Sequence, residues 1–204
     1  MWKGMDKQQV TTDALVDLSK AFDKADHKIL LDKMTKWSIY CDWFRSYLTA
    51  RTQAVQQDGS MSEFLPTTSG VPQGSCLGPV LFSIYTNDLP RHINSKVVMY
   101  ADDTQLDDQQ SAATTLQSDL MGLELWMVKN HQTINTAKTQ VITFGSRSQV
   151  KKVAADIANS LRIGQTTLKR INEVKNLGVG MDTSLSWQSH IKRWSKLKDE
   201  LDQP

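Results

Sequence analysis

The stretch Val97-Val98-Met99-Tyr100-Ala101-Asp102-Asp103 decides the fold, because it sets five apolar residues directly before two adjacent carboxylates. A short apolar run followed by charged residues predicts a buried strand that ends at those residues. The run Ala14-Leu15-Val16 likewise ends at a carboxylate, Asp17. If these two strands are neighbours in one sheet, three carboxylates gather in one place.

Clustered carboxylates need a charge partner. Two unit charges about 4 Å apart repel by roughly 4 kcal/mol at an effective dielectric constant of 20. Either one carboxyl group keeps its proton or a cation lies among them. Carboxylate-only sites suit hard ions such as Mg²⁺, in the layout of two-metal phosphoryl transfer. The alternative is that Asp102 and Asp103 are ordinary turn residues and that Asp17 merely ends a strand.

The spacing of apolar residues predicts the other elements, with Asp26 as the N-cap of the first helix. Asp58-Gly59 predicts a hairpin turn. Strands and helices that alternate with hairpins indicate an α+β fold. The predicted helices are 26–37, 77–87, 116–127, 187–201 and an amphipathic helix on Tyr40, Trp43, Phe44, Tyr47 and Leu48; the further strands are 140–144 and two short strands within 161–181.

Composition excludes several classes of protein. A net charge of +2 rules out a histone-like or strongly acidic chain, and 39% hydrophobic with 23% charged residues is typical of a globular domain. Cys41 and Cys76 form neither a disulfide framework nor a zinc-ligand spacing, which favours the reducing cytoplasm or nucleus. The longest apolar run has five residues, far below the length of a membrane span, so no membrane contact is expected.

The middle of the chain carries an unusual loop. No charged residue occurs between Phe64 and Asn87, and the segment Gly70-Val71-Pro72-Gln73-Gly74 lies within that stretch. Glycine and proline alternate there with apolar residues, so we expect a rigid loop that leads into a buried helix rather than a flexible linker.

Taken together, and in the order in which they occur along the chain, the motifs resemble the reverse transcriptases of non-LTR (LINE-type, jockey-like) retrotransposons. A Gly-x-Pro-Gln-Gly loop followed by Tyr-Ala-Asp-Asp, after an Asp-x4-Phe, is a specific combination. The resemblance extends from about residue 12 to residue 195. The matching segments are Val16-Asp17-Leu18-Ser19-Lys20-Ala21-Phe22-Asp23, Ser69 to Ser75, Tyr100-Ala101-Asp102-Asp103, Lys138-Thr139 and Leu177-Gly178-Val179.

The resemblance implies a role for each matching residue. Asp17 and Asp102, with Asp103 beside them, would bind two Mg²⁺ ions, for which Mn²⁺ can substitute. Lys138 would protonate the leaving pyrophosphate, although a lysine in this place is usually a solvated surface group. Tyr100 precedes the catalytic pair and would contact the primer or pack.

The resemblance also implies three substrate-binding residues. Phe22 would be the steric gate that excludes a ribose 2′-hydroxyl, where the alternative is core packing. Gln73 and Gly74 would touch the incoming nucleotide and the template, where the alternative is a buried turn. Glycine allows a backbone to approach a ligand closely.

The implied architecture is a polymerase palm, an antiparallel sheet backed by helices, in residues 1–150. Residues 151–204 would form a small β–α extension, an incomplete thumb or connection. Only 16 residues precede Asp17, so the fingers would be largely missing and this chain alone is expected to be weak or inactive.

The implied function is RNA-directed DNA synthesis, with an RNA template, a DNA primer and dNTPs as partners. One alternative is a non-catalytic remnant, at most a nucleic-acid-binding module. Another is an RNA-dependent RNA polymerase, which the bulky Phe22 disfavours because such an enzyme must admit the 2′-hydroxyl.

Overall fold

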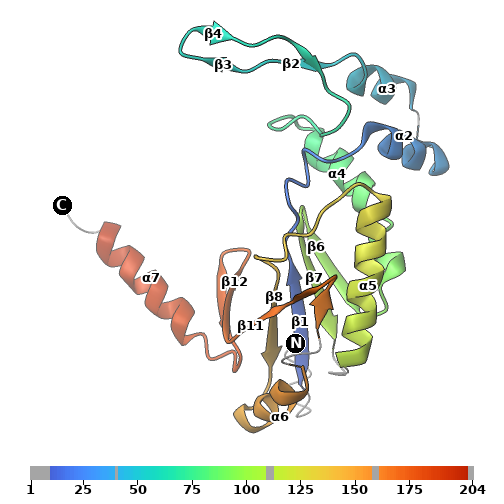
Figure 1. The fold of residues 1–204 in the computed structure, drawn as a ribbon. Coiled ribbons are helices and arrows are strands. Elements are labelled where there is room, and N and C mark those ends of the chain that lie inside the picture. Colours follow the sequence, from blue (N-terminus) through green and yellow to red (C-terminus); the bar gives the residue numbers. More distant parts are fainter. Residues whose placement is uncertain (1–9, 40, 109–112, 158–160, 202–204) are drawn as a thin grey trace.

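A five-stranded sheet forms the centre of the computed structural model, which describes residues 10–39, 41–108, 113–157 and 161–201 (Figure 1). The strand order is β11-β8-β1-β7-β6. All neighbours pair antiparallel except β11, which is parallel to β8. The strands are β1 (Thr11–Val16), β6 (Lys96–Tyr100), β7 (Asp103–Asp108), β8 (Gln140–Phe144) and β11 (Lys169–Ile171). The sheet and its helices confirm the predicted α+β class.

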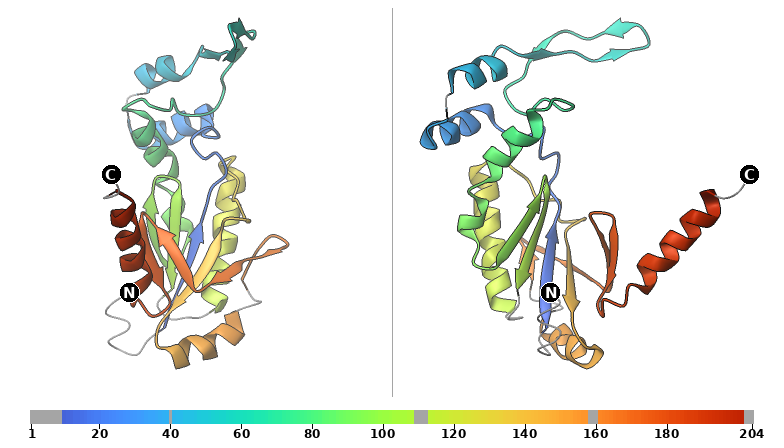
Figure 2. Two further views of the ribbon diagram at one scale, coloured as in Figure 1. Left: turned by 90° about the vertical axis from the view of Figure 1, so that its left-hand side faces the viewer. Right: turned by 180° about the vertical axis from the view of Figure 1, so that it is seen from behind.

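Helix α5 packs against one face of this sheet (Figure 2). Its apolar residues recur at helical spacing, and Leu116, Leu120, Leu123 and Met127 are all buried in the main core, which confirms the predicted helix. The helices are α2 (His27–Lys36), α3 (Asp42–Leu48), α4 (Gly78–Thr86), α5 (Ala113–Lys129), α6 (Arg147–Ile157) and α7 (Gln188–Leu201), with a 3-10 turn, η1, at Leu89–His92.

Helix α2 begins where the sequence predicts. The Asp26 side chain accepts a hydrogen bond from the backbone N–H of Ile29 at 3.0 Å. Burial alone would raise the pKa of Asp26, but hydrogen bonds from Ile29 and His131 outweigh it and leave the pKa below its ordinary value. The cap therefore satisfies an N–H group that the helix itself leaves free.

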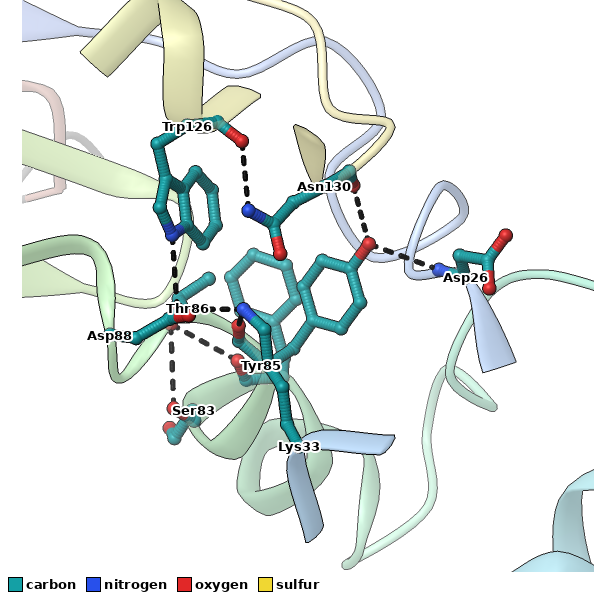
Figure 3. Close-up of polar contacts among 9 residues, drawn as sticks. Asp26, Lys33, Ser83, Tyr85, Thr86, Asp88, Trp126 and Asn130 are labelled. Atoms are coloured by element: carbon teal, nitrogen blue, oxygen red, sulfur yellow. Dashed lines mark hydrogen bonds and ion pairs between the residues drawn. The ribbon is translucent and has the colours of Figure 1, made fainter. Parts of the chain in front are cut away.

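A buried polar network joins α2, α4 and α5 (Figure 3). The Lys33 ammonium group donates to the carbonyl of Tyr85 and to the carboxylate of Asp88, each at 2.6 Å. The indole N–H of Trp126 donates to the same carboxylate at 3.0 Å, and the Tyr85 hydroxyl donates to the carbonyl of Asn130. These contacts fix the helices that support the loop ahead of α4.

A narrow arm of paired strands projects from the body between α3 and α4 (Figures 1 and 2). It contains β2 (Thr52–Gln53), β3 (Gln56–Gln57), β4 (Ser60–Met61) and β5 (Leu65–Pro66). Asp58 and Gly59 both have positive φ angles, +49° and +79°, and join β3 to β4. This confirms the predicted hairpin turn, because a tight turn of this kind matches the twist of the strands.

The C-terminal part contains more strands than the two predicted. They are β9 (Arg162–Ile163), β10 (Thr166–Thr167), β12 (Glu173–Asn176) and β13 (Val179–Asp182), in addition to β11. β12 and β13 form a separate hairpin, and α7 follows it and extends away from the sheet (Figure 1). Segments of two to four residues carry too little periodicity to be recognised in a sequence.

One prediction about burial was wrong. β6 is an edge strand, and its residues Lys96, Val98 and Tyr100 face solvent while Val97 and Met99 pack inward. An edge strand with one uncovered face cannot be buried on both sides. In α3, Leu48 is buried and Phe44 and Tyr47 pack partly buried against the core, as expected of an amphipathic helix. Trp43 is 53% exposed and stacks on Tyr47. Tyr40 lies outside the described residues.

Candidate active site

The ends of β1 and β7 bring two of the predicted carboxylates together. Val16 pairs with Thr104, and Asp17 and Asp103 come next at the same end of the two strands. Both line a cavity of about 270 Å³, together with Tyr100 and Lys138. The tertiary fold therefore assembles four of the predicted site residues around one cavity.

The backbone of Asp17 is held by a segment far away in the sequence. The carbonyl of Asp17 accepts from the backbone N–H of Asn135 at 2.8 Å, and its own N–H donates to the hydroxyl of Thr139 at 3.3 Å. Thr139 in turn donates to the carbonyl of Asn135 at 2.9 Å. A closed ring of hydrogen bonds thus fixes the point at which β1 presents its carboxylate.

The charges of Asp102 and Asp17 act on Asp103. Burial, followed by the negative charges of Asp102 and Asp17, raises the pKa of Asp103 above its ordinary value. Asp102 lies in the turn after Ala101, which has a φ angle of +54°, and it does not line the cavity. The resemblance assigns the metal to Asp17 and Asp102, whereas the cavity wall contains Asp17 and Asp103.

The chemistry of these carboxylates suits a cation better than their arrangement does. Their donor set is all oxygen, which hard divalent ions prefer, and their mutual repulsion is what a cation would relieve. Within the described ranges, however, no three His, Cys, Asp or Glu side chains are grouped so that they could hold a metal ion. The implied metal therefore fits the oxygen donors and the charge of Asp17, Asp102 and Asp103, whereas their grouping in this structure does not by itself form a metal site. Asp17 follows β1, Asp103 begins β7 and Asp102 lies in the turn before it.

A second cavity, of about 570 Å³, contains the other predicted substrate residues, Phe22, Gln73 and Gly74. The ring of Phe22 is half-buried and stacks on Phe82 of α4. The amide of Gln73 donates to the Asp23 carboxylate at 2.7 Å. No residue lines both this cavity and the one at Asp17 and Asp103.

The Gly-rich loop is bound to the segment that follows β1. The backbone N–H of Gly70 donates to Ala25 at 2.8 Å, and Nε2 of His27 donates to the carbonyl of Gly70 at 2.7 Å. Gly70 has a φ angle of +92°, and a Cβ atom there would lie 3.1 Å from the carbonyl oxygen of Asp23. Only glycine fits this close crossing of two backbones.

Two predicted residues are open to solvent. Tyr100 is 66% exposed and Lys138 is also exposed, and both line the Asp17 cavity. Neither is a core residue, so the packing alternative for Tyr100 does not describe its position.

Several other residues around this cavity have no role in the sequence-based prediction. Gln105 lies two residues after Asp103 on β7, so strand alternation places it on the same face. Lys175, Asn176 and Leu177 reach the cavity from the tip of the β12–β13 hairpin. Leu177 belongs to a segment that matches the family, whereas the positions of Lys175 and Asn176 carry no signal for this, because among the described residues the hairpin does not pair with the main sheet.

Comparisons with known proteins agree with this architecture. Residues 3–181 match the family model of reverse transcriptase (RNA-dependent DNA polymerase). The chain is 30% and 28% identical to the RNA-directed DNA polymerases from mobile element jockey of Drosophila funebris and Drosophila melanogaster, over 93% of this chain in both. It spans about a fifth of the length of these curated relatives, 21% in each case.

The fold is also similar to that of a solved telomerase. The telomerase from Candida tropicalis, in complex with a TWJ fragment of telomeric RNA, superposes with a TM-score of 0.60 at 11% identity, over 92% of this chain and 32% of that one. At this identity the likeness concerns the fold alone. Because the family match covers well over half of the residues and the strand ends agree with it, the chain belongs to the reverse transcriptases.

Proposed function

We propose that this chain carries the catalytic palm of an RNA-directed DNA polymerase, which transfers a nucleotide from a dNTP to the 3′-hydroxyl of a DNA primer on an RNA template. The observation that carries the proposal is the cavity in which Asp17 and Asp103 lie together at the ends of neighbouring strands, with the charge of Asp102 beside them. We place the reaction in the cytoplasm or nucleus.

The carboxylates would bind the metal ions. Asp17 and Asp102, with Asp103 beside them, would hold two Mg²⁺ ions, which Mn²⁺ can replace. Such ions, when bound, activate a hydroxyl group and neutralise phosphate charge. The ring around Asp17, made by Asn135 and Thr139, holds the backbone that carries its carboxylate before any ligand arrives. Preorganised charge of this kind costs no rearrangement during the reaction.

The remaining site residues would recognise the substrates. Lys138 is an exposed cation of the Asp17 cavity and would donate a proton to the leaving pyrophosphate. Phe22 would exclude the 2′-hydroxyl by its bulk, and its stack on Phe82 resists displacement. Gln73 and Gly74 would form the wall of the second cavity beside Phe22, and Tyr100 would contact the primer end.

A thermal melt tests the metal site without requiring activity. Mg²⁺ at ten times its dissociation constant should stabilise the chain by about 1.4 kcal/mol, which raises the melting midpoint by roughly 3–6 °C for a protein of this size. The Asp17→Asn/Asp102→Asn double variant should lose this rise. Asp58→Asn makes the same chemical change in the arm hairpin and should keep it. Equal shifts in wild type and double variant, at matched ionic strength, would exclude the site.

Primer extension on an RNA template tests the reaction itself, in a polymerase that contains this segment. Either single Asn variant should reduce incorporation by at least about 100-fold, because a positioned metal ligand supplies several kcal/mol of transition-state stabilisation. Unchanged incorporation in Asp17→Asn would overturn the proposal.

A further inference from the structure

A chain of three side chains connects the interior of the sheet to the tip of the β12–β13 hairpin. Nδ2 of Asn176 donates to Oε1 of Gln105 at 2.9 Å, and Nε2 of Gln105 donates to Oδ2 of Asp13 at 2.6 Å. Asp13 is only 1% exposed, on β1, and Gln105 reaches it diagonally from β7, where it pairs with Leu15. This row of three hydrogen-bonded side chains therefore begins at a buried carboxyl group and ends at the cavity that Asp17 and Asp103 line.

The hairpin needs such a contact because no backbone ladder holds it. In the part of the chain that the structure describes, β12 and β13 pair with each other and with no strand of the main sheet. The base of the hairpin is anchored by Val174 and Met181, which pack in a small cluster with Ile142 and Phe144. The backbone N–H of Gly145 also donates to the carbonyl of Thr183 at 3.0 Å.

The tip of the hairpin has a different anchor. Asn176 is the last residue of β12, and it pairs with Val179 across the turn Leu177-Gly178, in which both residues have positive φ angles. Val174 lies two residues before Asn176, and the backbone N–H of Gly180 donates to Nδ1 of His190 at 3.2 Å, so neither of these contacts joins the tip to β7. The bond from Asn176 to Gln105 is the contact by which the tip meets the strand of Asp103.

We propose that the Asp13–Gln105–Asn176 chain positions the hairpin tip over the cavity and so sets the distance between Leu177 and the catalytic carboxylates. Gln105 is the central member, since its amide is oriented by a hydrogen bond at each end. Asp13 is a positioning residue and does not touch the cavity. The inference rests on the proposed function only in taking this cavity as the place of reaction.

Exchanging the hydrogen-bond donor and acceptor between Asp13 and Gln105 tests this proposal. Gln105→Glu removes the donor to Asp13 and sets two carboxyl groups against each other. Asp13→Asn/Gln105→Glu restores two good contacts, because the new amide on β1 can donate to one oxygen of the new carboxylate on β7 while Asn176 still donates to the other. Asp13→Asn alone keeps an acceptor for Gln105 and should be tolerated. If the substitutions only damaged the fold, the double variant would not hold the hairpin tip better than Gln105→Glu alone does.

Hydrogen exchange of the backbone amides in 173–182, measured by mass spectrometry on the 204-residue chain at pH 8, reports on the tip directly. Asn176→Ala and Gln105→Glu should exchange about three- to tenfold faster than wild type, as the loss of one net hydrogen bond implies. Asp13→Asn/Gln105→Glu should return to within about twofold of wild type. Gln53→Glu, on the exposed arm, is the matched control and should have no effect.

The outcomes separate this inference from the proposed function, because no substrate or metal is used. Unchanged exchange in Asn176→Ala, whose substitution lies at the hairpin tip, would overturn the inference even if Gln105→Glu failed to fold. Equal exchange in Gln105→Glu and the double variant would also overturn it. Peptides from α5 should exchange alike in every variant that is folded.

Discussion

The ring of Phe22 lies on the ring of Phe82, with centroids 4.4 Å apart and planes inclined by 20°. Phe82 belongs to α4 and is 1% exposed, whereas Phe22 is half-buried and lines the cavity of the Gly-rich loop. One face of the Phe22 ring therefore packs on the core, and the same ring also borders the cavity. Packing describes the stack of Phe22 on Phe82, whereas exclusion of a substrate by Phe22 stays a prediction.

Replacing Phe22 by Val separates these two roles. In a polymerase that contains this segment, incorporation of rNTPs relative to dNTPs should rise by about 10-fold or more, because relief of one steric clash is worth more than about 1.4 kcal/mol. Use of dNTPs should change little. Single-nucleotide incorporation assays measure the ratio, and Phe64→Val on the exposed arm is the control. A ratio equal to that of wild type would leave core packing as the role of Phe22.

Asp13 should make the stability of the chain depend on pH. Burial, and then the neighbouring charge of Asp107, raises the pKa of Asp13 from 3.8 to about 7, while Gln105 and Lys96 act in the opposite direction. Between these two pH values the folded state holds a proton that the unfolded state has released. The free energy of unfolding should therefore fall as pH rises from about 4 to 7, and level off above it.

Asp13→Asn should abolish this dependence. Because a rise in pKa from 3.8 to about 7 corresponds to about 4 kcal/mol, the variant should be more stable than wild type at pH 8 by up to that amount, and nearly equal at pH 4. Urea unfolding at both pH values measures it. Asp58→Asn is the matched control. A variant that is less stable than wild type at pH 8 would show that Asp13 is not raised in pKa.

Lys33 should be worth more to stability than its exposed neighbours. Lys33→Met leaves Asp88 with the Trp126 N–H as its donor among the described residues and removes the bond to Tyr85. We expect a loss of about 1–3 kcal/mol in the free energy of unfolding. Lys36→Met, one turn away on the exposed side of α2, should stay within about 0.5 kcal/mol of wild type. Similar losses in both variants would contradict the assignment.

The two glycines of the loop should respond differently to alanine. Gly74 has a φ angle of +77° with nothing within 4 Å of an added Cβ atom, so Gly74→Ala should cost about 1–2 kcal/mol from backbone strain alone. At Gly70 the same strain is joined by contacts of 3.1 and 3.2 Å with the backbone of Asp23, so the cost should be about 2–4 kcal/mol. Chemical denaturation of the two variants compares them, and a costlier Gly74→Ala would contradict the geometry.

The sequence by itself determined those features whose physical cause is local. The capping carboxylate of Asp26, the turn at Asp58-Gly59 and the regular apolar spacing of α5 all act within a few residues, and all are found at the predicted positions. The apolar runs before Asp17 and Asp102 likewise predicted strands that end at carboxylates. The reverse transcriptase motifs themselves could be recognised because their order and spacing are properties of the chain.

Only the tertiary structure decided what depends on partners distant in sequence. Thr104-Gln105-Leu106-Asp107-Asp108 has little strand signal, yet it forms β7 because β1 and β6 pair with it on both sides. That pairing, and not the sequence motif, sets Asp103 rather than Asp102 in the cavity wall and places Gln105 beside Asp13. The hairpin tip at Asn176 reaches the same cavity from 71 residues beyond Gln105. Contacts of this kind exist only after the strands have paired, so no local pattern can encode them.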